Sequence, residues 1–141
     1  MGARAWIAVL AACVALAAQA APGDPVKAVY HMNEGVEHAP LFLRNIRNHL
    51  SVDPKAKIVV VTHGRGVNFL MRDAKDRNGN PFEVTVQTLV SEGVEFRVCE
   101  ITLKADNIDR RRLIDDVTYV PSGVAEIARL QVQEGFAYLK P

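Results

Sequence analysis

The residue best suited to covalent chemistry is Cys99, which lies in the stretch VEFRVCEITLK over residues 94–104. The other cysteine, Cys13, falls in a predicted N-terminal export signal, so Cys99 has no partner for an intramolecular disulfide in the exported protein. A single cysteine in such a protein indicates a reactive thiol or an intermolecular disulfide. Alternatively, Cys99 is a structural side chain, because free cysteine is among the most buried residue types.

Four predicted strands end in side chains that could bind or activate a ligand. In open parallel sheets, ligands bind beyond the carboxyl ends of the strands. The residues are His31 and Asn33 after strand 26–31, His63 after strand 57–62, Cys99 after strand 94–98, and Ser122 after strand 117–120. We therefore expect all of them along one edge of the sheet, with Cys99 as the catalytic residue and the others as binding residues.

The surroundings of Cys99 suggest how its thiol would be tuned. Arg97 lies two residues before it on the same strand face, and a helix that began just after Cys99 would place its N-terminus near the thiol. Both features would favour the thiolate, whereas Glu100 would oppose it. His31 and His63 could shape a pocket or carry protons, or each could simply close its strand with a hydrogen bond.

A metal site is an alternative interpretation of the same residues. His31, His63 and Cys99 offer imidazole and thiolate ligands, which suit copper or zinc. Their spacing matches no metal-binding motif. We therefore expect no cofactor and keep the metal site only as an alternative.

The elements that must position these residues alternate between strands and helices. The expected strands cover residues 26–31, 57–62, 94–98, 117–120 and 136–139, and the expected helices cover 36–50, 67–73, about 81–90 and 123–134. This order predicts a single α/β domain with a mostly parallel sheet of about five strands and helices on both faces.

Two helices carry clear boundary signals. Asn80, Pro81 and Glu83 have the types and spacing of an N-cap, a first helical residue and a capping-box carboxylate. Gly135 is expected to end the last helix as a C-terminal cap.

Composition and charge are those of an ordinary globular domain. The chain has 141 residues, of which 49% are hydrophobic and 23% are charged. Arg4 is the only charged residue among the first 20, which leaves 16 basic and 16 acidic side chains in the remainder. A neutral domain gives no electrostatic basis for binding nucleic acid or an anionic membrane.

The N-terminus has the pattern of a secretory signal. One early positive charge is followed by an apolar run over residues 5–18 and by the small-residue site Ala18-Gln19-Ala20. This pattern predicts a signal peptide at 1–20, a domain at 21–141 and a periplasmic location. In the alternative, Leu10-Ala11-Ala12-Cys13 is a lipoprotein box, and lipid on Cys13 would anchor the protein to a membrane.

Five stretches together resemble the DsrE/DsrF-like family of small sulfur-relay proteins, and in particular its exported, poorly characterised branch. They are VYHMNEG, VEHAPLFLRNIRNHL, IVVVTHGRGVNFL, GVEFRVCEITLKADNI and VPSGVAEIARLQVQEGFAYLKP. The resemblance covers residues 26–141 and rests on these stretches and one cysteine.

The resemblance implies a function for Cys99. In characterised members a cysteine accepts sulfur as a persulfide and passes it on, and Cys99 in RVCEITLK matches that position. It also implies a trimer or hexamer whose partners are thiol proteins or small sulfur compounds. We therefore expect a periplasmic sulfur carrier or sulfurtransferase-like protein, with a non-catalytic oligomeric binding module as the alternative to sulfur transfer and metal binding.

Overall fold

The computed structural model describes residues 23–141. The predicted signal peptide at 1–20 and its Cys13 lie outside the described residues, and both remain predictions.

A five-stranded sheet forms the centre of the domain, and every pair of neighbouring strands is parallel. The strands are β1 (Lys27–Met32), β2 (Lys57–Thr62), β3 (Glu95–Cys99), β4 (Val117–Val120) and β5 (Ala137–Leu139), in the spatial order β4-β3-β2-β1-β5. β2 is buried along nearly its whole length, as expected for a β-branched run in a central parallel strand. The expected fold class is confirmed.

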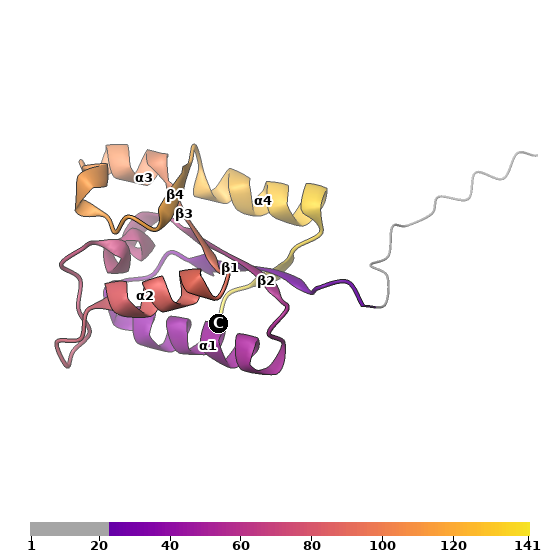
Figure 1. The fold of residues 1–141 in the computed structure, drawn as a ribbon. Coiled ribbons are helices and arrows are strands. Elements are labelled where there is room, and N and C mark those ends of the chain that lie inside the picture. Colours follow the sequence, from indigo (N-terminus) through magenta and orange to yellow (C-terminus); the bar gives the residue numbers. More distant parts are fainter. Residues whose placement is uncertain (1–22) are drawn as a thin grey trace, which may run out of the picture.

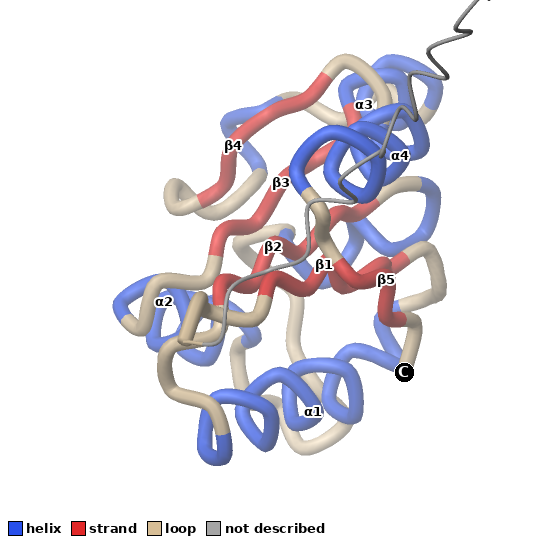
Figure 2. Tube along the Cα trace, turned by 90° about the vertical axis from the view of Figure 1, so that its right-hand side faces the viewer, coloured by secondary structure: helices blue, strands red, loops and turns tan. Residues whose placement is uncertain are grey.

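Helices connect the strands and cover the sheet on both sides (Figure 1). They are α1 (Ala39–Val52), α2 (Phe82–Ser91), α3 (Glu100–Ala105) and α4 (Gly123–Glu134), with 3-10 helices η1 (Val36–His38), η2 (Gly64–Leu70) and η3 (Arg110–Arg112). The two views place α1 and α2 on the face of the sheet opposite α4 (Figure 2).

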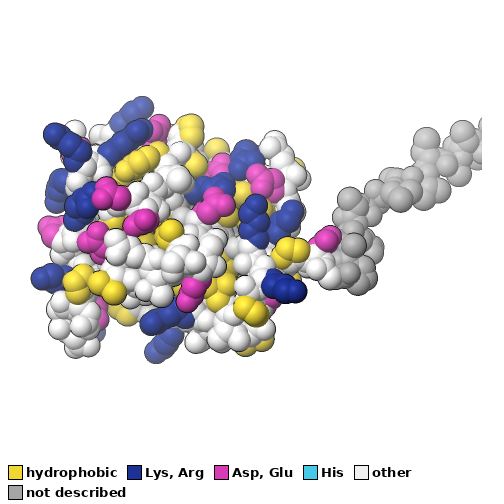
Figure 3. All heavy atoms as spheres, viewed as in Figure 1, with side chains coloured by type: hydrophobic (Ala, Val, Ile, Leu, Met, Phe, Trp, Pro, Cys, Tyr) yellow, Lys and Arg dark blue, Asp and Glu magenta, His cyan; other side chains and the backbone are white. Residues whose placement is uncertain are grey.

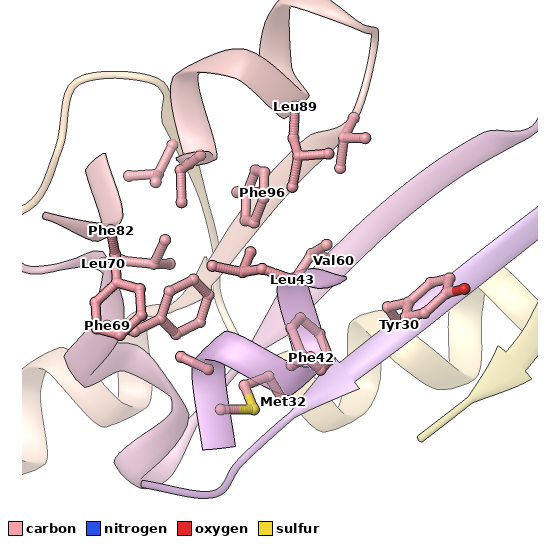
Figure 4. Packing of buried hydrophobic residues seen from close by; sticks show 14 of the residues in the cluster. Tyr30, Met32, Phe42, Leu43, Val60, Phe69, Leu70, Phe82, Leu89 and Phe96 are labelled. Carbon is pink, nitrogen blue, oxygen red and sulfur yellow. The ribbon is translucent and has the colours of Figure 1, made fainter. Parts of the chain in front are cut away.

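Two apolar clusters hold these layers together. The larger cluster packs α1, α2 and η2 against one face of the sheet, where Phe69 meets Phe42, Phe82 and Phe96 at centroid distances of 6.2–6.4 Å (Figure 4). The smaller cluster packs α4 against the other face through Val29, Val59, Val61, Ile127, Leu130 and Phe136. Strand alternation therefore decides which side chains point towards α4.

Three local expectations need correction or confirmation. The segment expected as a helix over 67–73 is η2, a 3-10 helix that starts earlier and ends at Leu70. α2 has Pro81 as its N-cap and no side-chain cap, because Asn80 instead bonds Asp76 in the preceding turn. Gly135 caps α4 as expected, with a φ of 72°, in the left-handed region that glycine adopts readily.

The visible surface mixes both signs of charge. Lys and Arg side chains alternate with Asp and Glu over the face shown in Figure 3. Among residues 23–141, no helix is both long enough and apolar enough to cross a membrane.

Candidate active site around Cys99

The sheet order brings the ends of β3, β2 and β1 side by side. Thr62 pairs with Val98, so the next residues, His63 just after β2 and Cys99 at the end of β3, lie next to each other. His31 pairs with Val61 on the other side of β2. Because side chains alternate along strands, these three residues share the face that α4 covers.

Gly123, the first residue of α4, lies between His63 and Cys99. A β-carbon at Gly123 would lie 3.2 Å from Cβ of His63 and 3.3 Å from Cβ of Cys99. The missing side chain therefore lets the N-terminus of α4 approach both residues.

Cys99 is buried, with 4% of its surface exposed, and its thiol is surrounded by hydrogen-bond donors. Burial raises the pKa of the thiol, but donors from Gly123, Thr102 and Ile101 outweigh it and bring the pKa below its ordinary value. These donors are the backbone N–H groups of all three residues and the hydroxyl of Thr102. The site is therefore built to stabilise a thiolate.

Thr102 connects this donor set to the loop after β2. Its Oγ1 accepts a hydrogen bond of 2.9 Å from the backbone N–H of Gly64, which leaves its own proton free to point at Cys99. Thr102 is itself buried, so the arrangement is shielded from water.

His31 and His63 form a direct pair at the ends of β1 and β2, next to the end of β3 that carries Cys99. Their Nε2 atoms are 2.7 Å apart, and their rings stack at a centroid distance of 4.8 Å. On the other side of His31, Nδ1 lies 2.7 Å from the hydroxyl of Tyr138 in β5.

Both histidines favour the neutral form. Burial lowers the pKa of His31 to about 4, helped by the neighbouring His63 and Lys140, while Glu34 acts in the opposite direction. Burial and Lys140 also lower the pKa of His63. At neutral pH each ring therefore has one N–H and one acceptor nitrogen, as the Nε2–Nε2 hydrogen bond requires.

The geometry gives no support to the metal alternative. Two zinc–nitrogen bonds of about 2.0–2.1 Å at a tetrahedral angle would hold the ring nitrogens roughly 3.3 Å apart, farther than the 2.7 Å between these Nε2 atoms. Within residues 23–141, no group of three or more His, Cys, Asp or Glu side chains is placed to hold a metal ion.

Arg97 and Ser122 have partners at or within α4. The guanidinium of Arg97 pairs with Glu95 and with Glu126 of α4, so its charge is held by these carboxylates and the thiolate is stabilised by N–H and O–H donors instead. Ser122 caps α4 by accepting a hydrogen bond of 3.3 Å from the N–H of Ala125. Both residues therefore position α4 over the site.

Asn33 lies just beyond β1, where the loop packs tightly against η2. Its Oδ1 is the one buried side-chain oxygen or nitrogen in residues 23–141 that has no hydrogen-bond partner. A β-carbon at Gly66 would lie 2.8 Å from Cα of Asn33, so this contact also requires glycine.

Sequence reasoning missed three residues of this site. Thr102 could have been found from its position, since it lies in the first turn of the helix that follows Cys99. Gly123 starts the helix after β4, where a backbone N–H is free. Tyr138 has no such signal, because its place beside His31 depends on the pairing of β5 with β1.

Comparisons with known proteins agree on the fold. The model of the DsrE/DsrF-like family matches residues 7–141. A solved structure of a protein of unknown function, MTH1491 from Methanobacterium thermoautotrophicum, is 33% identical, with a TM-score of 0.72 over 82% of this chain and 99% of that one. The ychN protein from E. coli shares the fold at 17% identity, with a TM-score of 0.68 over 82% of this chain and 97% of its own. No curated protein matches the chain.

Proposed function

The chain belongs to the DsrE/DsrF-like family, and on that premise we propose that it is a sulfur carrier that holds sulfur as a persulfide on Cys99. The observation that carries the proposal is the set of donors around the thiol, which lowers the pKa of Cys99 despite its burial. A thiolate is the reactive form in attack on sulfur.

The proposed chemistry consists of two sulfur transfers and needs no external oxidant. The thiolate of Cys99 attacks the outer sulfur of a donor persulfide, R–S–SH; the S–S bond of the donor breaks, R–S⁻ leaves, and Cys99–S–SH forms. An acceptor thiolate or sulfite then attacks the outer sulfur, and Cys99 leaves as a thiolate again. In both transfers the same N–H donors stabilise the charge on Sγ.

The rim of the site suits a macromolecular or thiol-bearing partner. Ile101 and Val124 are 61% and 63% exposed, and each lies at or next to a donor to Cys99. We propose that a partner docking over the site contacts these two side chains. The partners proposed are a sulfur donor and an acceptor, either thiol proteins or small sulfur compounds.

Export and assembly are parts of the same proposal. We infer from the N-terminal pattern that the protein is exported to the periplasm with cleavage after Ala20. A homotrimer or homohexamer is proposed from the family resemblance. Native and denaturing mass spectra of protein taken from the periplasm would report both the cleavage site and the number of copies.

The direct test replaces the thiol. We expect Cys99→Ser to abolish the gain of sulfur after incubation with glutathione persulfide, because serine cannot form a persulfide. The wild type should gain about 32 Da, the mass of one sulfur atom, or a multiple of it on the peptide that contains Cys99. Reductant should remove the gain, which separates a persulfide from irreversible oxidation to the sulfinic acid.

Cys13→Ser, tested in the uncleaved chain, is the matched control, since it removes the other cysteine and should leave the gain on the Cys99 peptide unchanged. A wild-type Cys99 that stays unmodified and also reacts slowly with iodoacetamide in the folded protein would contradict the carrier function. That result would favour the non-catalytic binding module.

A further inference from the structure

Three hydrogen-bonded side chains form a continuous chain from the neighbourhood of Cys99 to the surface. His63 Nε2 lies 2.7 Å from His31 Nε2, and His31 Nδ1 lies 2.7 Å from Oη of Tyr138. The three residues come from β1, β5 and the end of β2, which are neighbours in the sheet. At one end, His63 and Cys99 both have their β-carbons within 3.3 Å of the place that a β-carbon would take at Gly123; at the other end, Tyr138 is 42% exposed.

The hydrogen-bonded side chains His63, His31 and Tyr138 can hold their N–H and O–H protons in two arrangements without any movement of the heavy atoms. If His31 carries the shared proton on Nε2, its Nδ1 accepts from the hydroxyl of Tyr138, and His63 carries its proton on Nδ1. If His63 carries the proton on Nε2, His31 donates from Nδ1 to Tyr138, and His63 Nδ1 becomes an acceptor. A hydroxyl can both donate and accept, so Tyr138 suits either arrangement.

Burial and the charges around His63 and His31 keep the two rings neutral. Lys140 lies close enough to both rings to disfavour a second positive charge, and Glu34, which pairs with Lys140 at 3.6 Å, acts in the opposite direction on His31. A neutral chain with a shared proton can take up a proton at one end and release one at the other, whereas two protonated rings could not keep the Nε2–Nε2 hydrogen bond.

We propose that His63 exchanges a proton with the sulfur held by Cys99, while His31 and Tyr138 pass that proton to and from water. The inference rests on the sulfur-carrier function proposed above and deepens it. His63 is the acid–base group of the transfer, and His31 and Tyr138 are positioning residues that act through it.

The proton balance of loading shows what such a relay does. The net reaction is Cys99–SH + R–S–SH → Cys99–S–SH + R–SH, in which one S–S bond breaks and one forms. The thiol proton of Cys99 goes to His63 Nδ1, the proton on His63 Nε2 moves to His31, and Tyr138 releases one proton to water. The leaving R–S⁻ takes up a proton from water, so atoms and charges balance.

Burial of the thiol is the reason that a relay is needed. With 4% of Cys99 exposed, water has little direct access to its sulfur, whereas Tyr138 lies on the short strand β5 at the edge of the sheet. A persulfide also extends the reach of the site, because its outer sulfur lies about 2.05 Å beyond Sγ. That sulfur is the atom on which an acid–base group would act in the second transfer.

The test is single-turnover loading of the full chain with glutathione persulfide, in H₂O and in D₂O. We expect Tyr138→Phe and His31→Gln each to slow loading about 10-fold, below the roughly 100-fold or more of complete general acid–base catalysis, because His63 itself remains. The wild type should be slower in D₂O, and the two variants should lose part of that difference. The equilibrium fraction of thiolate, read from absorbance at 240 nm, should stay unchanged, since the donors to Cys99 are untouched.

The chain offers a matched control in a second histidine–tyrosine pair. Tyr30 Oη lies 2.9 Å from Nδ1 of His49, and Tyr30 packs against Phe42 of α1 on the opposite face of the sheet. Tyr30→Phe should load at the wild-type rate, which separates loss of the relay from loss of a tyrosine hydroxyl in general.

Each outcome supports or overturns the relay. If the wild type loads and both variants load at the same rate with the same isotope effect, the relay is wrong and the carrier function stands. If the wild type does not load, the carrier function fails. The ¹⁵N chemical shifts of the His63 ring nitrogens then test the relay separately. Ring signals that change in both Cys99→Ser and Tyr138→Phe support a proton connection to both ends, and signals that change in neither overturn it.

Discussion

At the scale of single residues, the reactivity of Cys99 depends on Thr102. Its hydroxyl and its backbone N–H both lower the pKa of the thiol, and its oxygen also accepts from Gly64. Thr102→Val removes the hydroxyl at nearly constant volume. We expect the pKa of Cys99 to rise, because burial then opposes a smaller set of donors, and the thiolate absorbance at 240 nm should appear at higher pH.

The same substitution also leaves the N–H of Gly64 without its acceptor, which should cost about 1–3 kcal/mol in the free energy of unfolding. Thr102→Ser is the control, since it keeps the hydroxyl. A titration of Cys99 that is identical in the valine and serine variants would show that the hydroxyl has no part in stabilising the thiolate.

At the scale of elements, the N-terminus of α4 must lie close to the ends of β2 and β3. In Gly123→Ala the new methyl group would sit 3.2–3.3 Å from the β-carbons of His63 and Cys99, a tight contact that α4 or these neighbours must relieve by a few tenths of an ångström. We expect a loss of about 1–3 kcal/mol in the free energy of unfolding by urea, the usual cost of overpacking. The pKa of Cys99 should rise as well, because the N–H of residue 123 moves away from the sulfur.

Val124→Ala tests whether this effect belongs to the close approach or to the helix as a whole. Val124 is the next residue of α4 and is 63% exposed, so its truncation should change neither stability nor the thiol titration appreciably. Equal effects at positions 123 and 124 would contradict the packing role assigned to Gly123.

At the scale of the whole molecule, the histidine pair makes stability depend on pH. The pKa of His31 is about 4 in the fold and about 6.5 in an unfolded chain, so between these values the unfolded state binds more protons. The free energy of unfolding should therefore fall as the pH falls from 6.5 towards 4. Urea unfolding at pH 7.5, 6.5, 5.5 and 4.5, roughly spanning the reference pKa of histidine, would measure this slope.

Replacement of the titrating ring should flatten that part of the curve. His31→Gln should lose less stability than the wild type between pH 6.5 and 4.5, whereas His38→Gln, at an exposed position in η1, should follow the wild type. A wild-type slope that both variants reproduce would show that other groups cause the acid sensitivity.

The sequence by itself determined the five strands, the helices α1, α2 and α4, and the edge where the site lies. The β-branched run of β2 and the helical spacing of Phe42, Leu43 and Ile46 in α1 are local patterns, and the strand ends after them follow directly. For the same reason, His31, His63 and Cys99 could be placed at one edge of a parallel sheet.

Only the tertiary structure decided which of these residues meet. The order β3-β2-β1-β5 puts His63 between Cys99 and His31 and brings Tyr138 to the far side, and no local pattern encodes strand order. Arg97 pairs with Glu126 because α4 crosses that face of the sheet and brings a carboxylate to the guanidinium. The donors to Cys99 come from two helices, α3 and α4, that meet only when the sheet is assembled, so the tuning of the thiol is a property of the fold and not of the stretch RVCEITLK.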